Sequence, residues 1–269
     1  MLSLLSAGQG QDVIVWDVDA LAFIAATGIT DMLQKIAVNN LCTSMKTAGI
    51  WVQMLAVYPF VGGTATTCKF NLMKPLDTDA AYRLTFGGGI TFATSGVTPN
   101  GTNGYADTHL NLLSKLPAYN LSFGYTSTTA RTSENSSQIG CIDTTQPSRY
   151  TANLWYSAVG AKFASMGAYP VQSPSSTNNN TIGTIIGSRT SNTYASLFFN
   201  GSRLSVITAT SAVTNTNLNA FVFAANQNGS ATEYTGMVST FAFVGTGLND
   251  TDAANFSSII TNYNTYLGR

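Results

Sequence analysis

The chain has 269 residues, of which 9% are charged, 11% are aromatic and 44% are hydrophobic, and twelve basic side chains balance twelve acidic ones. A membrane span needs an apolar run of about 20 residues, which the sequence lacks, and a nucleic-acid-binding surface needs a surplus of basic residues. The hydrophobic content is too high for a disordered chain, so we expect a folded protein with no nucleic-acid partner and no membrane span.

The first ten residues combine an apolar tip with two glycines. Leu2, Leu4 and Leu5 form the tip, and Gly8 and Gly10 follow it. A frayed terminus accounts for this pattern, and so does a peptide that anchors the protein to a partner. On the second interpretation, residues 1–15 are a flexible anchor peptide, and deleting residues 1–10 leaves the fold intact.

Helical signals dominate residues 16–58. Acidic residues precede an apolar run of helical spacing that ends at Gly28. Thr30 is the predicted N-cap of a second helix, and Gly49 marks the end of its apolar pattern. Residues 51–58 are predicted to add a short turn.

Residues 59–269 change to a β pattern. Turns rich in Gly, Asn and Thr separate stretches of alternating polarity, and Asn200-Gly201 is a strong hairpin signal. The predicted strands cover residues 82–86, 105–110, 119–126, 138–142, 150–157, 161–165, 184–187, 195–200, 203–208, 219–225 and 234–245. Short strands without interleaved helices predict a mainly β fold, an antiparallel two-sheet sandwich.

One amphipathic helix ends the chain. Asn249 is its predicted N-cap, and Gly268 closes it. Its apolar stripe consists of Ala253, Phe256, Ile259, Ile260, Tyr263 and Leu267. Because the stripe is too short for a coiled coil, we expect this helix to pack back on the sandwich.

The cysteines do not form a recognisable framework. Cys42, Cys68 and Cys141 are widely spaced, odd in number and without a C-x-x-C pair. This pattern favours buried free thiols over a disulfide framework or a zinc site, although a single bridge stays open.

Titratable groups for catalysis are scarce. His109 and Asp107 lie on one face of a predicted strand, but no nucleophile elbow accompanies them. Glu134 and Glu233 lie far apart in turn-like contexts and match no glycosidase motif. We therefore expect a protein that is not an enzyme and has no cofactor, with a Ca²⁺ site at Asp107 and Asn103 as the conceivable exception.

Aromatic side chains are the remaining candidates for binding. Trp155, Tyr156, Tyr169 and Tyr194 are possible glycan-stacking residues. Residues 155 and 156 point to opposite faces of their strand, so the alternative is that some of these rings fill the core.

Several segments of the chain resemble a signature of bacteriophage virion proteins. They read FIAATGITD (23–31), GIW (49–51), YPFVGGT (58–64), FNL (70–72), DAAYRLTF (79–86), PNGTNGYADT (99–108), GTGL (245–248) and YLGR (266–269). The chain is thereby similar to the concanavalin A-like, or laminin-G-like, jelly-roll proteins of phage fibres and spikes. The resemblance implies a jelly roll, the absence of catalysis and a location on the virion exterior.

These observations favour a structural protein of a phage fibre, spike or decoration that attaches to a host surface. Its expected partners are other virion proteins and a host glycan or protein. Phage fibres are commonly trimers and zero net charge removes self-repulsion, so we expect a homotrimer. The alternative is a lectin-like carbohydrate-binding module with the same fold.

Overall fold

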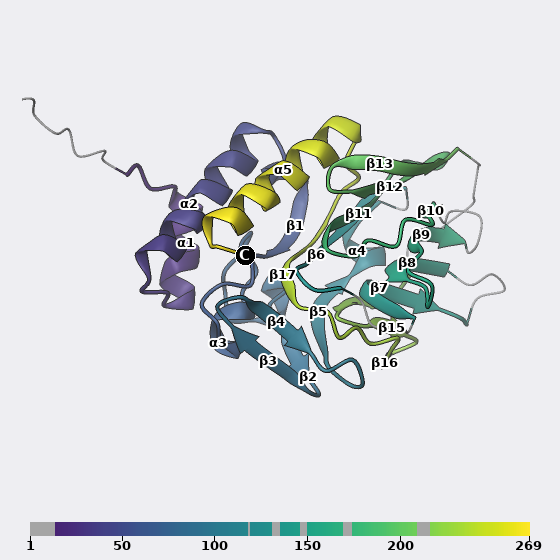
Figure 1. The fold of residues 1–269 in the computed structure, drawn as a ribbon, viewed down its shortest axis with the longest axis horizontal. Coiled ribbons are helices and arrows are strands. Elements are labelled where there is room, and N and C mark those ends of the chain that lie inside the picture. Colours follow the sequence, from purple (N-terminus) through teal and green to yellow (C-terminus); the bar gives the residue numbers. More distant parts are fainter. Residues whose placement is uncertain (1–13, 118, 131–134, 146–149, 169–173, 209–215) are drawn as a thin grey trace, which may run out of the picture.

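A computed structural model describes residues 14–117, 119–130, 135–145, 150–168, 174–208 and 216–269. In these ranges the chain forms three layers, which are a layer of helices, a sheet that we call sheet A, and a second sheet, sheet B (Figure 1). The helices lie against the outer face of sheet A, and sheet B covers its inner face. The prediction of an antiparallel jelly-roll sandwich with N-terminal helices and a C-terminal helix is confirmed.

The helix layer is built from both ends of the described chain. It consists of α1 (Val18–Thr27), α2 (Met32–Thr47) and α5 (Asp250–Tyr266). Shorter helical turns occur in loops, at η1 (Trp51–Gln53), α3 (Ala65–Cys68), η2 (Asp79–Ala81) and α4 (Leu112–Lys115). No helix in the described ranges is both long enough and apolar enough to cross a membrane.

The strands pair within two sheets in the part of the chain that the structure describes. Sheet A has the order β13 (Ser202–Ile207), β12 (Tyr194–Phe199), β11 (Gly183–Ser191), β6 (Leu121–Ser127), β17 (Ser239–Gly245), β4 (Gly96–Pro99) and β3 (Ile90–Ala93), and β1 (Met54–Tyr58) also pairs with β17. Sheet B has the order β10 (Ser175–Ser176), β9 (Lys162–Ala168), β8 (Tyr150–Tyr156), β7 (Ser136–Asp143), β14 (Asn219–Val222), β5 (Tyr105–Asn111) and β2 (Thr85–Gly87). β15 (Ala225–Gln227) pairs in parallel with β7 and antiparallel with β16 (Ser230–Thr232).

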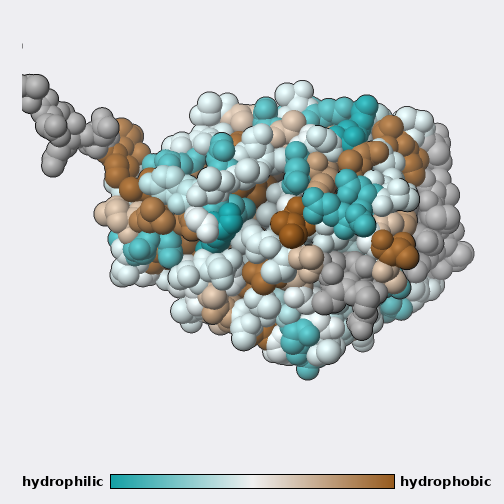
Figure 2. Space-filling view, in the orientation of Figure 1, coloured by the Kyte–Doolittle hydropathy of each residue, from teal (hydrophilic) through white to brown (hydrophobic). Residues whose placement is uncertain are grey.

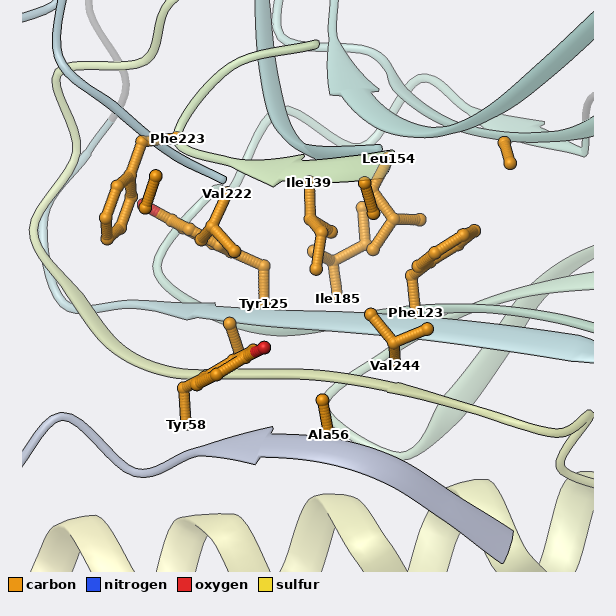
Figure 3. Close-up of a cluster of buried hydrophobic side chains, with 14 of the residues drawn as sticks. Ala56, Tyr58, Phe123, Tyr125, Ile139, Leu154, Ile185, Val222, Phe223 and Val244 are labelled. Atoms are coloured by element: carbon orange, nitrogen blue, oxygen red, sulfur yellow. The ribbon is translucent and has the colours of Figure 1, made fainter. Parts of the chain in front are cut away.

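The main hydrophobic core lies between the sheets. Figure 3 shows side chains of sheet B pointing down onto those of sheet A, with Ile139 and Leu154 above Phe123 and Ile185. All four side chains are fully buried. Because successive strand residues point to opposite faces, this core takes every second residue of each central strand.

The other face of sheet A packs against the helices. Ile186, Phe241 and Phe243 alternate with the sandwich-facing residues of β11 and β17, and their side chains join a second core with α1, α2 and α5. Phe243 packs against Phe256 of α5, with the ring centroids 4.6 Å apart and the ring planes tilted by 47°. Sheet A is therefore apolar on both faces, which is typical of a strand layer enclosed between two others.

Side-chain caps define where the long helices begin. Asp17 caps α1 and forms an ion pair with Lys46 at 2.7 Å. Asp31 caps α2, so the predicted cap at Thr30 is wrong by one residue, since the chain is already extended at Asp31 and its carboxylate accepts from the first turn. Asn249 caps α5 as predicted.

The prediction of a short turn within residues 51–58 is confirmed for residues 51–53 and wrong for the rest of the segment. This segment contains η1 and then strand β1, which pairs antiparallel with β17. Ala56 and Tyr58 face the sandwich core, whereas Val57 faces the helices. Since both faces are buried, the strand has no polar alternation by which a sequence pattern could have revealed it.

The cysteines agree with the sequence analysis. Cys42, Cys68 and Cys141 all lie in described ranges, and each is a free, buried thiol. Burial raises the pKa of Cys68 to about 11 and that of Cys141 to about 12. These thiols therefore stay protonated at neutral pH and contribute to packing.

Candidate functional site

A hollow lies on the helix side of sheet A beside the last turns of α5, and we call it the α5 pocket. Its volume is about 560 Å³. It is lined by Thr126, Ser127, Thr128, Ile182, Gly183, Thr184 and Asn200 from the strand layer, and by Thr261, Asn264, Thr265 and Arg269 from α5 and the residues after it. Hydroxyl and amide side chains thus make up most of the lining.

Two threonines of sheet A contribute paired hydroxyls to the pocket. Thr126 of β6 and Thr184 of β11 are direct neighbours in the strand pairing, and their Oγ1 atoms lie 2.9 Å apart. Both residues are almost fully buried. Tyr125 points into the sandwich core, so Thr126, the next residue, points to the helix layer. The apolar helix-facing surface of sheet A therefore becomes polar at this position.

The predicted hairpin at Asn200-Gly201 forms one wall of the pocket. Both residues have positive φ, 48° and 80°, as a tight two-residue hairpin requires. The Asn200 Oδ1 atom accepts a hydrogen bond of 2.8 Å from the backbone N–H of Thr184. A Cβ atom on Gly183 would lie 2.2 Å from that oxygen, so the absence of a side chain at Gly183 is what lets Asn200 reach across.

The side of α5 that faces the pocket carries polar atoms without partners. Asn264 is 6% exposed, and its buried Oδ1 atom finds no hydrogen-bond partner among the residues that the structure describes. The Nε and Nη1 atoms of Arg269 are also buried and have no hydrogen-bond partner among the described residues. Buried polar groups in native proteins almost always have a partner, so these atoms indicate a place where a ligand or water supplies one.

One cationic side chain borders the pocket. Arg269 carries the only charged side chain among the lining residues, and no Asp or Glu lies there. Burial raises the pKa of the Tyr263 hydroxyl, and the nearby guanidinium of Arg269 opposes that rise. The carbonyl groups that end α5 carry partial negative charge, which offsets part of the guanidinium charge before any ligand is present.

The sequence-predicted aromatic residues do not form one surface. Trp155 is half-buried and stacks on Phe163 with ring centroids 4.2 Å apart, on the face of sheet B away from the core. Tyr156 is fully buried in the sandwich core, so its ring is not available to stack on a glycan. Tyr194 belongs to β12 in sheet A, and its hydroxyl accepts a 2.6 Å hydrogen bond from Arg203. Tyr169 lies outside the described residues.

The predicted anchor residues Leu2, Leu4 and Leu5 also lie outside the described residues. Where the described chain begins, however, the surface is apolar. Val15 and Val18 are 81% and 74% exposed, and Figure 2 shows hydrophobic surface at the start of the described chain.

The single histidine lies in a polar cluster at the edge of sheet B. His109 Nε2 lies 2.8 Å from Thr85 Oγ1, and its Nδ1 lies 3.8 Å from Asp107 Oδ2. Asp107 also accepts a hydrogen bond from Asn219, whereas the Asn103 side chain bonds to residues of its own loop and of the β2–β3 turn. The structure therefore shows no shared Asp107–Asn103 site. In the described ranges, no group of three or more His, Cys, Asp and Glu side chains could hold a metal ion.

The structure describes only one of the two glutamates that the sequence analysis considered for catalysis. Glu134 lies outside the described residues. Glu233 has a positive φ of 54°, and its Oε2 accepts a 2.8 Å hydrogen bond from Ser137. Ser137 in turn accepts one from Asn153, whose buried Oδ1 has no partner among the described residues. This small network lies on the same face of sheet B as Trp155.

Comparisons with known proteins connect the fold to sialidases. A mutant of Trypanosoma rangeli sialidase displaying trans-sialidase activity matches with a TM-score of 0.52 and 10% identity over 86% of this chain. Domain 4 of a GH43 extracellular arabinanase from Geobacillus stearothermophilus, in complex with arabinotriose, matches with a TM-score of 0.47 and 13% identity, over 76% of this chain and 98% of that domain. No family model and no curated protein matches the chain.

The sialidase comparison corrects one expectation. We predicted that the chain is not an enzyme, and that prediction is contradicted, because a structure with a similar fold is an enzyme of the sialidase class. The chain spans only 39% of that protein, and at 10% identity the likeness concerns the fold. The scarcity of titratable groups in the sequence was therefore an insufficient reason to exclude catalysis.

Proposed function

We propose that this protein recognises a glycan and that the α5 pocket holds one of its sugar units. The observation that carries the proposal is the buried, unpartnered Oδ1 of Asn264 in a hollow lined by hydroxyls and amides. An unsatisfied buried acceptor costs about 1–3 kcal/mol. A sugar hydroxyl that donates to this oxygen removes the cost.

The rest of the lining suits the same ligand. Hydroxyl groups both donate and accept hydrogen bonds, so Thr126 and Thr184 can adapt to the hydroxyls of a sugar ring. The exposed side chain of Ile182 supplies an apolar contact at the rim. Small-ligand sites combine apolar contacts with precisely placed polar groups that fix the orientation of the ligand.

Replacing Asn264 with leucine is expected to weaken glycan binding by about tenfold, because one buried hydrogen bond of about 1.4 kcal/mol is lost. The ligand would be found on an array of printed saccharides, and its affinity measured by calorimetry. Asn262→Leu is the matched control, since Asn262 lies on the same helix but lines the groove between α2 and α5.

Equal losses in the two variants would contradict the assignment to the α5 pocket. The absence of binding to any printed saccharide, with a folded wild-type protein, would contradict glycan recognition itself. The same mixtures can be analysed for shortened saccharides, which would reveal cleavage of the bound glycan.

We further propose that the protein lies on the exterior of a phage particle, as a fibre, spike or decoration, and attaches to a glycan of the host surface. The sequence resemblance described above supports this location. The exposed apolar residues Val15, Val18 and Leu21 support a docking surface next to the predicted anchor peptide. A homotrimer is part of this proposal, and its mass can be measured by light scattering.

Deleting residues 1–10 is expected to leave the fold intact and to lower the amount of protein on purified particles several-fold. The physical reason is that the apolar tip, Leu2, Leu4 and Leu5, would lose its contact with the particle. Quantitative mass spectrometry of particles assembled with each variant measures the effect. Incorporation of the truncated chain at the wild-type level would refute the anchor.

A further inference from the structure

We infer that the sugar unit in the α5 pocket carries a carboxylate, so that the preferred ligand is an acidic saccharide. This inference rests on the proposed function and names the class of ligand for the same pocket. It follows from the two buried guanidinium nitrogens of Arg269 that have no acceptor among the described residues.

The guanidinium needs an acceptor that the described residues do not provide. Arg269 has five N–H donors and no acceptor of its own, and its buried Nε and Nη1 atoms make no hydrogen bond there. Two other cations of the protein have carboxylate partners. Lys46 contacts Asp17, and Arg203 contacts Asp250 at 2.5 Å. Arg269 differs from these two cations because its Nε and Nη1 atoms have no hydrogen-bond acceptor among the described residues.

The charge balance of the lining favours an anion over a neutral ligand. No Asp or Glu side chain lies among the lining residues, so no acidic side chain there repels an anionic ligand. A carboxylate is the acceptor whose planar geometry best fits a guanidinium, and charge-assisted hydrogen bonds are about twice as strong as neutral ones. Burial lowers the effective dielectric constant and increases this attraction relative to water.

The remaining groups fit the rest of the sugar rather than a bare anion. Asn264 Oδ1 is an acceptor, which requires a donor such as a hydroxyl. Thr126, Thr184 and Thr261 supply hydroxyls that suit a ring with several hydroxyl groups. A ligand that satisfies both Asn264 and Arg269 must therefore carry hydroxyl donors and an anionic acceptor together.

The test compares methyl glucuronoside, which has a carboxylate, with methyl glucoside, which has a hydroxymethyl group in its place. We expect the wild-type protein to bind the glucuronoside at least about tenfold more tightly, as one charge-assisted hydrogen bond would give. Arg269→Gln should remove this preference, so that the two glycosides bind with equal affinity. Arg269→Lys, which keeps the charge, should retain part of it. Thermal unfolding of each variant checks that the fold is preserved.

The outcomes separate the two proposals. Equal affinity of the wild-type protein for both glycosides would overturn the acidic-saccharide inference and leave glycan recognition standing. A preference for the glucuronoside that persists in Arg269→Gln would overturn the role of Arg269. Binding of neither glycoside nor any printed saccharide by folded protein would overturn both the inference and the proposed function.

Discussion

Replacing Phe243 with alanine is expected to lower the free energy of unfolding by about 4 kcal/mol, within the range for buried Phe-to-Ala changes. Phe243 is fully buried where sheet A meets α5, and its ring packs against that of Phe256. Its ring also covers Gly124 of β6, since a Cβ atom on Gly124 would lie 1.9 Å from the ring. The substitution therefore leaves a cavity bounded by a helix and two strands, which cannot collapse without moving one of them.

Urea unfolding measures this loss, and two further variants sharpen the test. Phe163→Ala removes an equal ring from the half-buried face of sheet B, and we expect it to cost only about 1 kcal/mol. Gly124→Ala should destabilise the wild-type protein strongly but cost much less in the Phe243→Ala background, because the clashing ring is gone. Additive effects of the two substitutions would contradict the packing described here.

Replacing Lys162 with methionine is expected to change the pH dependence of stability. Lys162 is fully buried between the sheets, its Nζ lies 4.3 Å from the Phe199 ring centroid, and it donates a 2.6 Å hydrogen bond to the carbonyl of Asn178. Burial lowers the pKa of Lys162 to about 8. Above pH 8 the unfolded chain holds this proton more firmly than the folded protein, so the contribution of Lys162 to stability rises with pH.

The wild-type protein should therefore gain about 2 kcal/mol relative to Lys162→Met between pH 7 and about 9.5. Methionine fills a similar volume without a charge, so this variant should be the more stable one at pH 7. Denaturant unfolding at several pH values measures the difference between the variants, in which the titration of buried Tyr and Cys cancels. Lys115→Met, at an exposed position, is the control. Parallel pH profiles for wild-type and Lys162→Met would show that burial does not perturb this lysine.

The sequence predicted most of the fold because its elements obey local rules. The alternation in 105–110 and the caps and apolar stripe of the C-terminal helix each reflect a single buried face. The prediction failed at β1 because a strand enclosed between two layers has no polar face. The prediction also missed β3 and β4. Each of these strands has only four residues, and the surrounding Gly and Thr residues are typical of turns.

The candidate site could not be predicted from sequence patterns. Thr126, Thr184 and Asn264 lie on three elements far apart in the chain, and each looks like an ordinary surface residue in its own segment. The pairing of β6 with β11 brings the two threonines together, and the packing of α5 on sheet A places Asn264 beside them. A weak signal did exist, because Asn264 falls one position after Tyr263 on the buried stripe of the helix. The predicted aromatic residues were easier to recognise as binding candidates. Trp155 and Tyr156 belong to sheet B, however, and Tyr194 belongs to sheet A, so these three do not form one binding surface.

The position of β17 has a consequence for how the protein folds. β17 lies between β6 and β1 in sheet A, yet it follows every other described strand in the sequence. During synthesis the ribosome therefore releases the neighbours of β17 long before β17 itself. Until then β6 and β1 have unpaired edges, which invite pairing with other chains. The central strand must insert last, and this long-range closure should make folding slow.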